Sequence, residues 1–399
     1  MNIGWIGLGK LGKPCAALMA SRFKVYAYDS NPEAINANHK EEGLRQSWVD
    51  LIEVCGSVEY VCDLSDIVFV AVQTPHDPMH EGITPYSGES ADFDYSHLLA
   101  VLKEIADHRR NQQIVIVSTV CPGTFQGVIF PELRGRIPRS EIIYNPFFIA
   151  MGTTVWDLTN PEFVLAGIDT TSTDLTNLRS IYEKILANSA DVIPMSHLNA
   201  EFTKMFYNTA IGLKIMFANT VMEMCDRMGG DCDVVQYALK SADQRIVGRA
   251  YMSGGMGDGG ACHPRDNLVL SNLCQKLEMD YNIFADMMAA RDRQAEYLVN
   301  IMREHDPPYW IFGARYKRNT NLTIGSCSML VKNLMENGEA SIFDPDCGYP
   351  AGPTEKSTIL IGMDGDWFGE QNIPVGSVVI DPWRTTPVSD RYTLYQVGR

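Results

Sequence analysis

The first thirty residues place the strongest constraint on the fold. An apolar stretch over Asn2–Ile6 runs directly into Gly7-Leu8-Gly9-Lys10-Leu11-Gly12, and a helical pattern follows over residues 13–21. A second apolar stretch over residues 24–28 ends on Asp29. In a strand–helix–strand unit, three glycines at this spacing allow a tight turn, close approach of the backbone to a pyrophosphate, and close helix packing. The order therefore predicts a dinucleotide-binding unit whose cofactor loop contains Gly7, Gly9, Leu11 and Gly12.

Asp29 indicates which dinucleotide is bound. A carboxylate about 20 residues after such a glycine turn accepts hydrogen bonds from the cofactor ribose. A 2′-phosphate would be repelled by this charge, so we expect NAD. The N-terminus of the helix after the turn would supply amide donors to the phosphates.

The alternation of strands and helices continues for almost half of the chain. Strand-like stretches recur over residues 66–73, 113–118, 141–145, 162–166 and 191–193, with helical patterns over residues 95–108, 124–133 and 172–187. This order predicts an α/β fold with a parallel, doubly wound Rossmann sheet whose ligands lie at the carboxyl ends of its strands. Thr74 and Thr119 fall at two such ends and are predicted to contact the cofactor. The polar segment 73–92 is long enough to be a functional or mobile loop.

Composition limits the possible partners. A chain of 399 residues suggests two or three domains, and 33 Lys and Arg against 49 Asp and Glu give a net charge of −16. Such a charge repels nucleic acid and anionic membranes, so an anionic substrate needs a locally basic pocket. The apolar runs are far shorter than the roughly 20 residues of a membrane span. Ten scattered cysteines and an N-terminus without leader features favour a reducing cytoplasm and no structural metal.

Residues 197–228 form the longest helical pattern. Apolar residues recur there at helical spacing, and the run is much longer than an average helix. We expect it to link the two halves and to take part in a homodimer or larger homo-oligomer, because so apolar a stripe is seldom left bare. Glu201, Lys204 and Asn208 share one face of this helix. That face is either a solvated polar stripe or part of an active site.

Residues 254–267 join a glycine-rich loop to a single thiol. Five glycines in seven positions are followed by Cys262, Pro264, Arg265 and Asp266. Glycine allows positive φ and close approach to a ligand, and a cationic neighbour with a helix beginning near Pro264 would favour the nucleophilic thiolate. Taken alone, the stretch is equally compatible with a surface loop and an inert cysteine.

The last ninety residues repeat the order of the first thirty in a simpler form. After helices over residues 231–242, 267–276 and 282–305, a strand over 309–312, a glycine, a helix over 326–337 and a strand over 340–343 lead to Asp344, with further strands over 358–362 and 377–380. This order predicts a smaller Rossmann-like sheet. We therefore expect an NAD-binding domain over residues 1–196, a central helical and dimerisation region with the cysteine loop over 197–306, and a smaller nucleotide-binding domain over 307–399, to which the family resemblance described below assigns the nucleotide sugar.

Four stretches together resemble the nucleotide-sugar 6-dehydrogenases, the UDP-glucose/GDP-mannose dehydrogenase family. They are the glycine turn, Ser118-Thr119-Val120, the helix over residues 201–208, and the loop over 259–266, whose GG-x-C-x-P-[K/R]-D pattern is the most specific. The likeness runs from Met1 to Asp344 and is loose beyond. It implies oxidation of the C6 alcohol of a nucleotide sugar, most like UDP-glucose, to the uronate with two NAD.

The resemblance also implies roles for individual residues. Cys262 would hold the aldehyde as a thiohemiacetal and then as a thioester. Lys204 and Asn208 would stabilise the oxyanion, and Asp266 would position water or move a proton. Arg265 would lie near the cofactor. The nucleotide sugar would be bound by Lys204, Asn208, Arg245, Tyr251, Gly257 and Lys317, with Arg245 reaching the substrate of a neighbouring subunit.

Three departures from the family pattern bear on this expectation. Where the family has Asn-Pro-Glu-Phe-x-x-Glu-Gly, this chain has Phe147 and Met151 in place of both glutamates, the first of which is thought to activate the water that hydrolyses the thioester. Asp258 and His263 replace apolar residues of the cysteine loop. One of them is a candidate for the missing base, and the alternative is that both are solvated loop residues. Near Lys317 the pattern also loses an arginine that contacts the cofactor.

Two other functions fit parts of the sequence. A two-electron 3-hydroxyacid dehydrogenase shares the pattern over residues 4–14 and a helical Lys-x-x-x-Asn, but it needs neither the cysteine loop nor a third domain. A catalytically silent nucleotide-sugar binder would account for Phe147 and Met151. Retention of Cys262, Lys204 and Asp266 argues against loss of activity.

Overall fold

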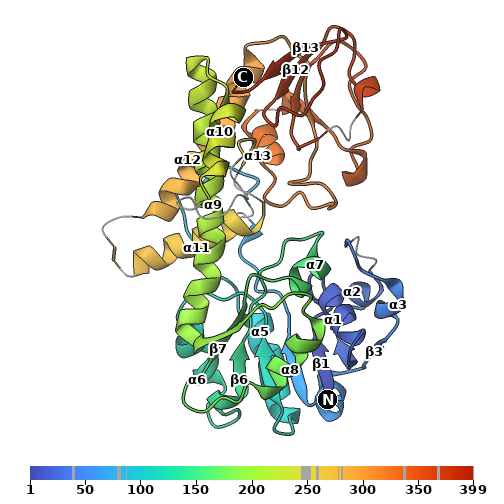
Figure 1. Cartoon of the computed structure of the whole chain (residues 1–399), viewed down its shortest axis with the longest axis vertical. Coiled ribbons are helices and arrows are strands. Elements are labelled where there is room, and N and C mark those ends of the chain that lie inside the picture. Colours follow the sequence, from blue (N-terminus) through green and yellow to red (C-terminus); the bar gives the residue numbers. More distant parts are fainter. Residues whose placement is uncertain are drawn as a thin grey trace. The chain divides into compact units, whose positions relative to one another are not determined.

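The computed structural model describes residues 1–37, 41–78, 82–86, 88–243, 253–257, 260–276, 278–279, 282–335, 338–365 and 369–398 (Figure 1). The chain divides into two compact units. The first comprises Met1–Pro75 and Phe93–Phe206, and the second comprises His76–Asp92 and Tyr207–Arg399. Within the described ranges, no helix has both the length and the apolar character that crossing a membrane requires.

An eight-stranded sheet forms the centre of the first unit, in the order β3-β2-β1-β4-β5-β6-β7-β8. Its strands are β1 (Asn2–Ile6), β2 (Lys24–Tyr28), β3 (Ile52–Val54), β4 (Ile67–Val70), β5 (Gln113–Ile116), β6 (Ile142–Tyr144), β7 (Val164–Ile168) and β8 (Val192–Ser196). The predicted α/β fold and its parallel sheet are confirmed from β3 to β6. The expectation that the whole sheet is parallel is wrong at one place, because β6 and β7 pair antiparallel. Asn145 lies at this reversal, where its buried amide donates to the Leu165 carbonyl at 2.7 Å.

Helices cover both faces of this sheet. They are α1 (Gly12–Ala20), α2 (Pro32–Asn36), α3 (Gln46–Val49), α4 (Val58–Leu64), α5 (Ser96–His108), the π-helical turn η2 (Phe125–Ile129) continuing into α6 (Phe130–Glu132), α7 (Thr154–Thr159) and α8 (Thr176–Ile185). Successive strand residues point to opposite faces. In β4, accordingly, Phe69 joins the apolar cluster that contains α1 and α8, while Val68 joins the cluster that contains α4 and α5.

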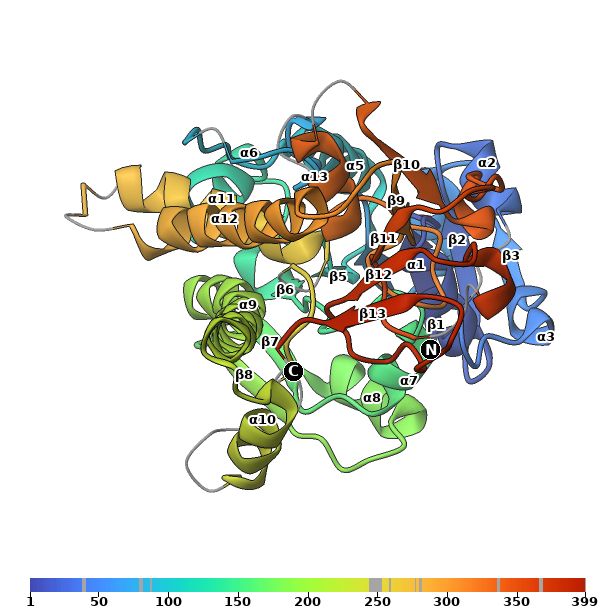
Figure 2. The same cartoon turned by 90° about the horizontal axis from the view of Figure 1, so that it is seen from above.

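The helical part follows the sequence closely. Helix α9 spans His197–Met228, with the bounds that its periodicity predicts. The others are α10 (Cys232–Ser241), α11 (Cys262–Lys276) and α12 (Ile283–Arg303), and α11 and α12 pack side by side in the second unit (Figure 2). Helix α11 begins at Cys262, two residues before the helix start expected near Pro264 and five before the helical pattern over residues 267–276. Pro264 is tolerated there because the first turn of a helix has no partner for its amide groups.

A second, entirely parallel sheet lies in the second unit, in the order β10-β9-β11-β12-β13. Its strands are β9 (Tyr309–Phe312), β10 (Ala340–Phe343), β11 (Thr358–Ile361), β12 (Val378–Asp381) and β13 (Thr393–Gln396), with α13 (Cys327–Leu334) between the first two. The predicted likeness to the N-terminal unit is visible in one contact. Asp344 accepts the Ala314 amide at 2.9 Å, as Asp29 accepts the Leu8 amide at 2.6 Å. Asp344 also pairs with the buried guanidinium of Arg315.

The polar segment after β4 belongs to the second unit. The buried Arg291 on α12 donates to the Gly82 carbonyl, and the neighbouring Asp292 accepts the Tyr86 amide. At the end of the segment, Asp92 pairs with Lys276 of α11 at 2.9 Å. The described part of residues 76–92 is therefore packed on α11 and α12. Gly82 lies against Pro264 in the first turn of α11.

Candidate active site

The glycine turn after β1 has the shape that a dinucleotide requires. Gly7 has φ +101°, and a side chain there would meet the Ala71 carbonyl at 2.6 Å. A Cβ on Gly12 would lie 2.0 Å from the Gly7 oxygen, so the first turn of α1 packs directly on the loop. Leu11 precedes that helix. In contrast, no neighbouring heavy atom of the described residues lies within 4 Å of a Cβ built on Gly9, which leaves room for a phosphate.

Asp29 shapes the same turn. One carboxylate oxygen accepts the Leu8 amide at 2.6 Å and the other accepts the Asn31 amide at 2.8 Å. A carboxylate has about four lone-pair sites, so these two bonds leave acceptors for ribose hydroxyls. The residues thus fit the adenosine half of an NAD cofactor.

Two more of the predicted cofactor residues are in direct contact. The Thr74 hydroxyl, which is buried, donates to the Thr119 carbonyl at 2.7 Å. Beside this bond, the Ser118 hydroxyl donates to the Val72 carbonyl at 2.6 Å. The chain segments that follow β4 and β5 are therefore fixed to each other at the edge of the sheet where the cofactor is expected.

Glu201 has a structural role that the sequence did not reveal. Its side chain is fully buried, and its two oxygens accept the Gly123 and Phe125 amides at 2.7 Å each. The carboxylate thereby fixes the start of the turn η2, a few residues after Thr119. Burial raises its pKa from 4.5 to about 7, because the charged form is desolvated. The signal available in the sequence was an acidic residue near the start of a largely apolar helical run, far from the other two acidic residues of that run, Glu223 and Asp226.

Lys204 is buried one turn further along α9. Its ammonium donates to the Phe147 carbonyl at 3.0 Å and lies 5.0 Å from the centre of the Phe148 ring. The Phe147 side chain belongs to the apolar core of the first unit, with its ring centre 6.4 Å from that of Trp5. The residue that replaces the family glutamate therefore offers Lys204 a main-chain oxygen and no carboxylate.

The cysteine loop presents Cys262 at the N-terminus of α11. All ten cysteines lie in the described part of the chain, and Cys262 alone among them is exposed. Gly260 has φ +104°, and a Cβ there would meet the Tyr316 ring at 2.5 Å. A Cβ on Gly255 would meet the Trp383 ring at 2.3 Å. Packing against protein neighbours therefore accounts for these glycines, where the sequence suggested close approach to a ligand.

Asp266 is the centre of a small polar cluster in the second unit. Its fully buried carboxylate accepts the Asn208 amide at 2.6 Å, and Arg265 holds its other oxygen at 2.8 and 2.9 Å. Cys262 and Asp266 are four residues apart on α11, so they share one face of that helix. The structure thus connects Asn208, Arg265 and Asp266, and it places Cys262 one helical turn away.

The remaining predicted residues are placed less completely. Lys317 is half-buried, with its ammonium 5.8 Å from the Tyr316 ring centre, and the Gly257 carbonyl accepts the Asn219 amide at 2.6 Å. His263 is buried and packs near Gly212 of α9, so the idea that it is a solvated loop residue is wrong. Arg245, Tyr251, Asp258 and Gly259 lie outside the described residues. Over the described ranges, no group of His, Cys, Asp and Glu side chains could hold a metal ion.

A doubly wound sheet with this glycine turn and this acid at the second strand defines a dinucleotide-binding domain of the class that NAD-dependent enzymes contain. Comparison of the sequence with family models narrows the class. Residues 1–186 match the NAD-binding domain of the UDP-glucose/GDP-mannose dehydrogenase family, and residues 198–293 match its central domain. The chain belongs to the UDP-glucose/GDP-mannose dehydrogenase family.

Individual relatives agree with this assignment. The UDP-glucose 6-dehydrogenase of Pseudomonas aeruginosa is 30% identical over 287 residues, which cover 69% of this chain and 60% of that protein. The structure of a UDP-glucose dehydrogenase from Pyrobaculum islandicum superposes with a TM-score of 0.82 at 22% identity, covering 100% of this chain and 97% of that one. The structure of UDP-D-ManNAc dehydrogenase from Pyrococcus horikoshii superposes with a TM-score of 0.80 at 20% identity, covering 100% of this chain and 99% of that one. At these identities the two structures support the fold.

Proposed function

We propose that the chain oxidises the C6 alcohol of a nucleotide sugar, most like UDP-glucose, to the carboxylate with two NAD. The observation that carries this proposal concerns α11, where the buried Asp266 carboxylate lies on the same helix face as the exposed Cys262. Asn208 and Arg265 both bind this carboxylate. A two-electron dehydrogenase has no use for such a thiol. The names of the relatives support a nucleotide-sugar substrate.

The cofactor is assigned to the first unit and the thiol to the second. Gly7, Gly9, Leu11 and Gly12 would hold the pyrophosphate, Asp29 the ribose, and Thr74 and Thr119 the far half of the molecule. When bound, NAD accepts one hydride in each of the two oxidations.

The first oxidation removes a hydride from C6 while the proton of the C6 hydroxyl passes to water positioned by Asp266, the proposed proton shuttle, and an aldehyde is left. The Cys262 thiolate adds to the aldehyde carbon, and its electron pair forms the C–S bond of a thiohemiacetal while the carbonyl oxygen becomes an oxyanion. Lys204 and Asn208 are the proposed donors to that oxyanion. Asn208 is fixed by its bond to Asp266, so it needs no reorganisation during the reaction.

The second oxidation removes another hydride from C6 and leaves a thioester on Cys262. Water then attacks the thioester carbon and the C–S bond breaks. The Cys262 thiolate is regenerated and the free acid is released. Asp266 is the proposed acceptor for the proton of this water, because Phe147 supplies none. His263 and Asp258 remain candidates for the same role.

The other substrate contacts are proposals of the same kind. Lys317, Gly257, Arg245 and Tyr251 are assigned to the nucleotide portion, where cations suit a diphosphate despite the net charge of −16. We also propose the three-domain division at residues 196 and 306, a homodimer or larger homo-oligomer formed through α9, and a cytoplasmic location.

A stoichiometric assay tests the proposed function. Purified protein is incubated with NAD and, in turn, UDP-glucose, UDP-N-acetylhexosamines, GDP-mannose and a 3-hydroxyacid, and NADH is measured against the product formed. Two NADH per acid with one of these substrates is expected, and Cys262→Ala should abolish the acid. One NADH per product from a 3-hydroxyacid would favour the two-electron alternative, and the absence of NADH with every substrate would favour a silent binder.

A further inference from the structure

The beginning of the cysteine loop is held by buried side chains from several elements. Asn219 of α9 accepts the Gly255 amide at 2.9 Å and donates to the Gly257 carbonyl at 2.6 Å. Gln236 of α10 accepts the Gly254 amide at 2.9 Å. Each of these two side chains is 1% exposed, so the bonds are shielded from water. The path of the loop is therefore set by side chains that are remote in the sequence.

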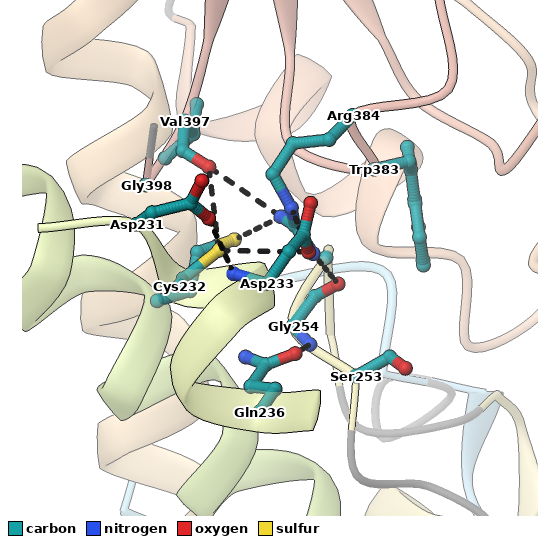
Figure 3. A network of polar contacts seen from close by, with 12 residues as sticks. Asp231, Cys232, Asp233, Gln236, Ser253, Gly254, Trp383, Arg384, Val397 and Gly398 are labelled. Atoms are coloured by element: carbon teal, nitrogen blue, oxygen red, sulfur yellow. Dashed lines mark hydrogen bonds and ion pairs between the residues drawn. The ribbon is translucent and has the colours of Figure 1, made fainter. Parts of the chain in front are cut away.

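Arg384 completes this set from the far end of the chain (Figure 3). One guanidinium nitrogen donates to the Gly254 carbonyl at 3.1 Å, and another pairs with Asp233 of α10 at 2.8 Å. The third nitrogen lies 3.4 Å from the Val397 carbonyl near the C-terminus. A single side chain, itself 3% exposed, thus connects the cysteine loop, α10 and the chain after β13.

The backbone around Arg384 is built to present it. Arg384 has φ +59°, a backbone conformation that residues other than glycine rarely adopt. The fully buried Asp381 holds the turn by accepting the Trp383, Arg384 and Thr386 amides at 2.8, 2.9 and 2.7 Å. The same turn places the Trp383 ring against Gly255. The two side chains of the turn therefore contact the first two glycines of the loop, Arg384 at Gly254 and Trp383 at Gly255.

We propose that Arg384 is a positioning residue for the reaction: it fixes the loop that leads into Cys262 and thereby the thiol. The inference rests on the proposed function, in which Cys262 is the nucleophile. A lysine cannot replace this arginine, because one ammonium cannot reach the Asp233, Gly254 and Val397 oxygens from their different directions. Asp233 contributes by supplying the counter-charge for a guanidinium that is otherwise buried.

The inference is tested with Arg384→Lys, Asp233→Asn and the double variant. Steady-state kinetics give kcat and the KM values for NAD and for the nucleotide sugar, and hydrogen exchange of the substrate-free enzyme reports on the amides of residues 253–257. We expect Arg384→Lys to lower kcat about 10- to 100-fold, to leave the KM for NAD within about twofold, and to speed exchange of the Gly254 and Gly255 amides. Asp233→Asn should act in the same direction more weakly, and the double variant should be little worse than Arg384→Lys because both residues act through one contact.

Arg109→Lys is the matched control. It alters another buried arginine, paired with Glu141 in the first unit, and should leave both kcat per folded molecule and exchange at residues 253–257 unchanged. Should Arg384→Lys fail to fold, Asp233→Asn provides the same comparison. Wild-type kcat and exchange in a folded variant would overturn the inference, and so would a rise confined to the KM for the nucleotide sugar, which would mean direct substrate contact. Acid formation by Cys262→Ala would refute the proposed function instead, and the exchange rates would still decide how the loop is held.

Discussion

At the scale of single residues, the protein keeps several charged groups away from water. Glu201 is fully buried against two amides, and Asp266 is fully buried between an amide and a guanidinium. Burial of a carboxylate is costly unless hydrogen bonds or a counter-charge replace its hydration. The groups that donate to Glu201 are neutral main-chain amides, whereas Asp266 is paired with the guanidinium of Arg265. The two carboxylates should therefore respond differently to substitution.

Glu201 should make stability depend on pH between about 4.5 and 7. Its pKa is raised from 4.5 to about 7 in the folded protein, so in this window the folded chain keeps a proton that the unfolded chain releases. This contribution to stability is fully present below pH 4.5 and is lost as the pH rises through 7. Urea unfolding of wild type and Glu201→Gln from pH 4.5 to 8 measures it, with the decline shallower in the variant. Parallel pH profiles for the two proteins would contradict this assignment.

Replacing Asp266 by asparagine should remove most activity. The substitution keeps the size of the side chain but removes both the negative charge that pairs with Arg265 and the proposed proton acceptor. We expect kcat to fall about 10²- to 10⁴-fold, the usual contribution of a positioned acid or base. Asp92→Asn, which affects the more exposed pair with Lys276, is the control and should be near wild type. A Asp266→Asn variant that retains wild-type kcat would remove Asp266 from the mechanism.

Restoring the family glutamate at position 147 should not restore a base. The Phe147 ring is 8% exposed and lies in the apolar core, so Phe147→Glu buries a carboxylate without its hydration. We expect a loss of about 3 kcal/mol or more in the free energy of unfolding and no faster product release. Phe147→Leu, which stays apolar, should cost less. Faster acid release by a stable Phe147→Glu protein would show that the glutamate position is still open to the site.

At the scale of elements, the strongly periodic segments could be predicted from the sequence and the irregular ones could not. The bounds of β1, β2, α9, β9 and β10 agree with the sequence patterns, because each shows sustained periodicity or a clear apolar run between breakers. The short strand β3 was missed because it lies at the edge of its sheet with little burial. The reversal at β7 depends on the Asn145 contact with Leu165, a tertiary bond that no local pattern announces.

Gly260 of the cysteine loop and Gly135 both have positive φ but differ in their surroundings. Gly260 combines a positive φ with direct contact to the Tyr316 ring, so Gly260→Ala incurs both backbone strain and overlap. Gly135 has φ +75°, but a Cβ there would meet no neighbouring heavy atom of the described chain within 4 Å. Gly135→Ala should therefore cost about 1 kcal/mol of unfolding free energy, and Gly260→Ala about 2 to 4 kcal/mol. Equal losses in chemical denaturation would mean that the Tyr316 contact is not tight.

At the scale of the whole molecule, the sequence predicted both sheets, and the residues of the proposed site are those that its motifs suggested. It could not show that residues 76–92 pack on α11 and α12, because Arg291 and Asp292 make those contacts across about 200 positions of the chain. Nor could it show that Arg384, which follows β12, anchors the cysteine loop. Both findings concern side chains that bind main-chain groups far away in sequence, where periodicity carries no information.

The central feature of the proposed mechanism is a covalent bond between Cys262 and the oxidised C6 carbon. The direct measurement is the mass of the peptide that contains Cys262, taken from enzyme quenched in acid during turnover with UDP-glucose and NAD. We expect an added mass equal to the nucleotide-sugar acyl group on that cysteine, and none on the other nine cysteines. An unmodified Cys262 peptide throughout a turnover that yields the acid would contradict it.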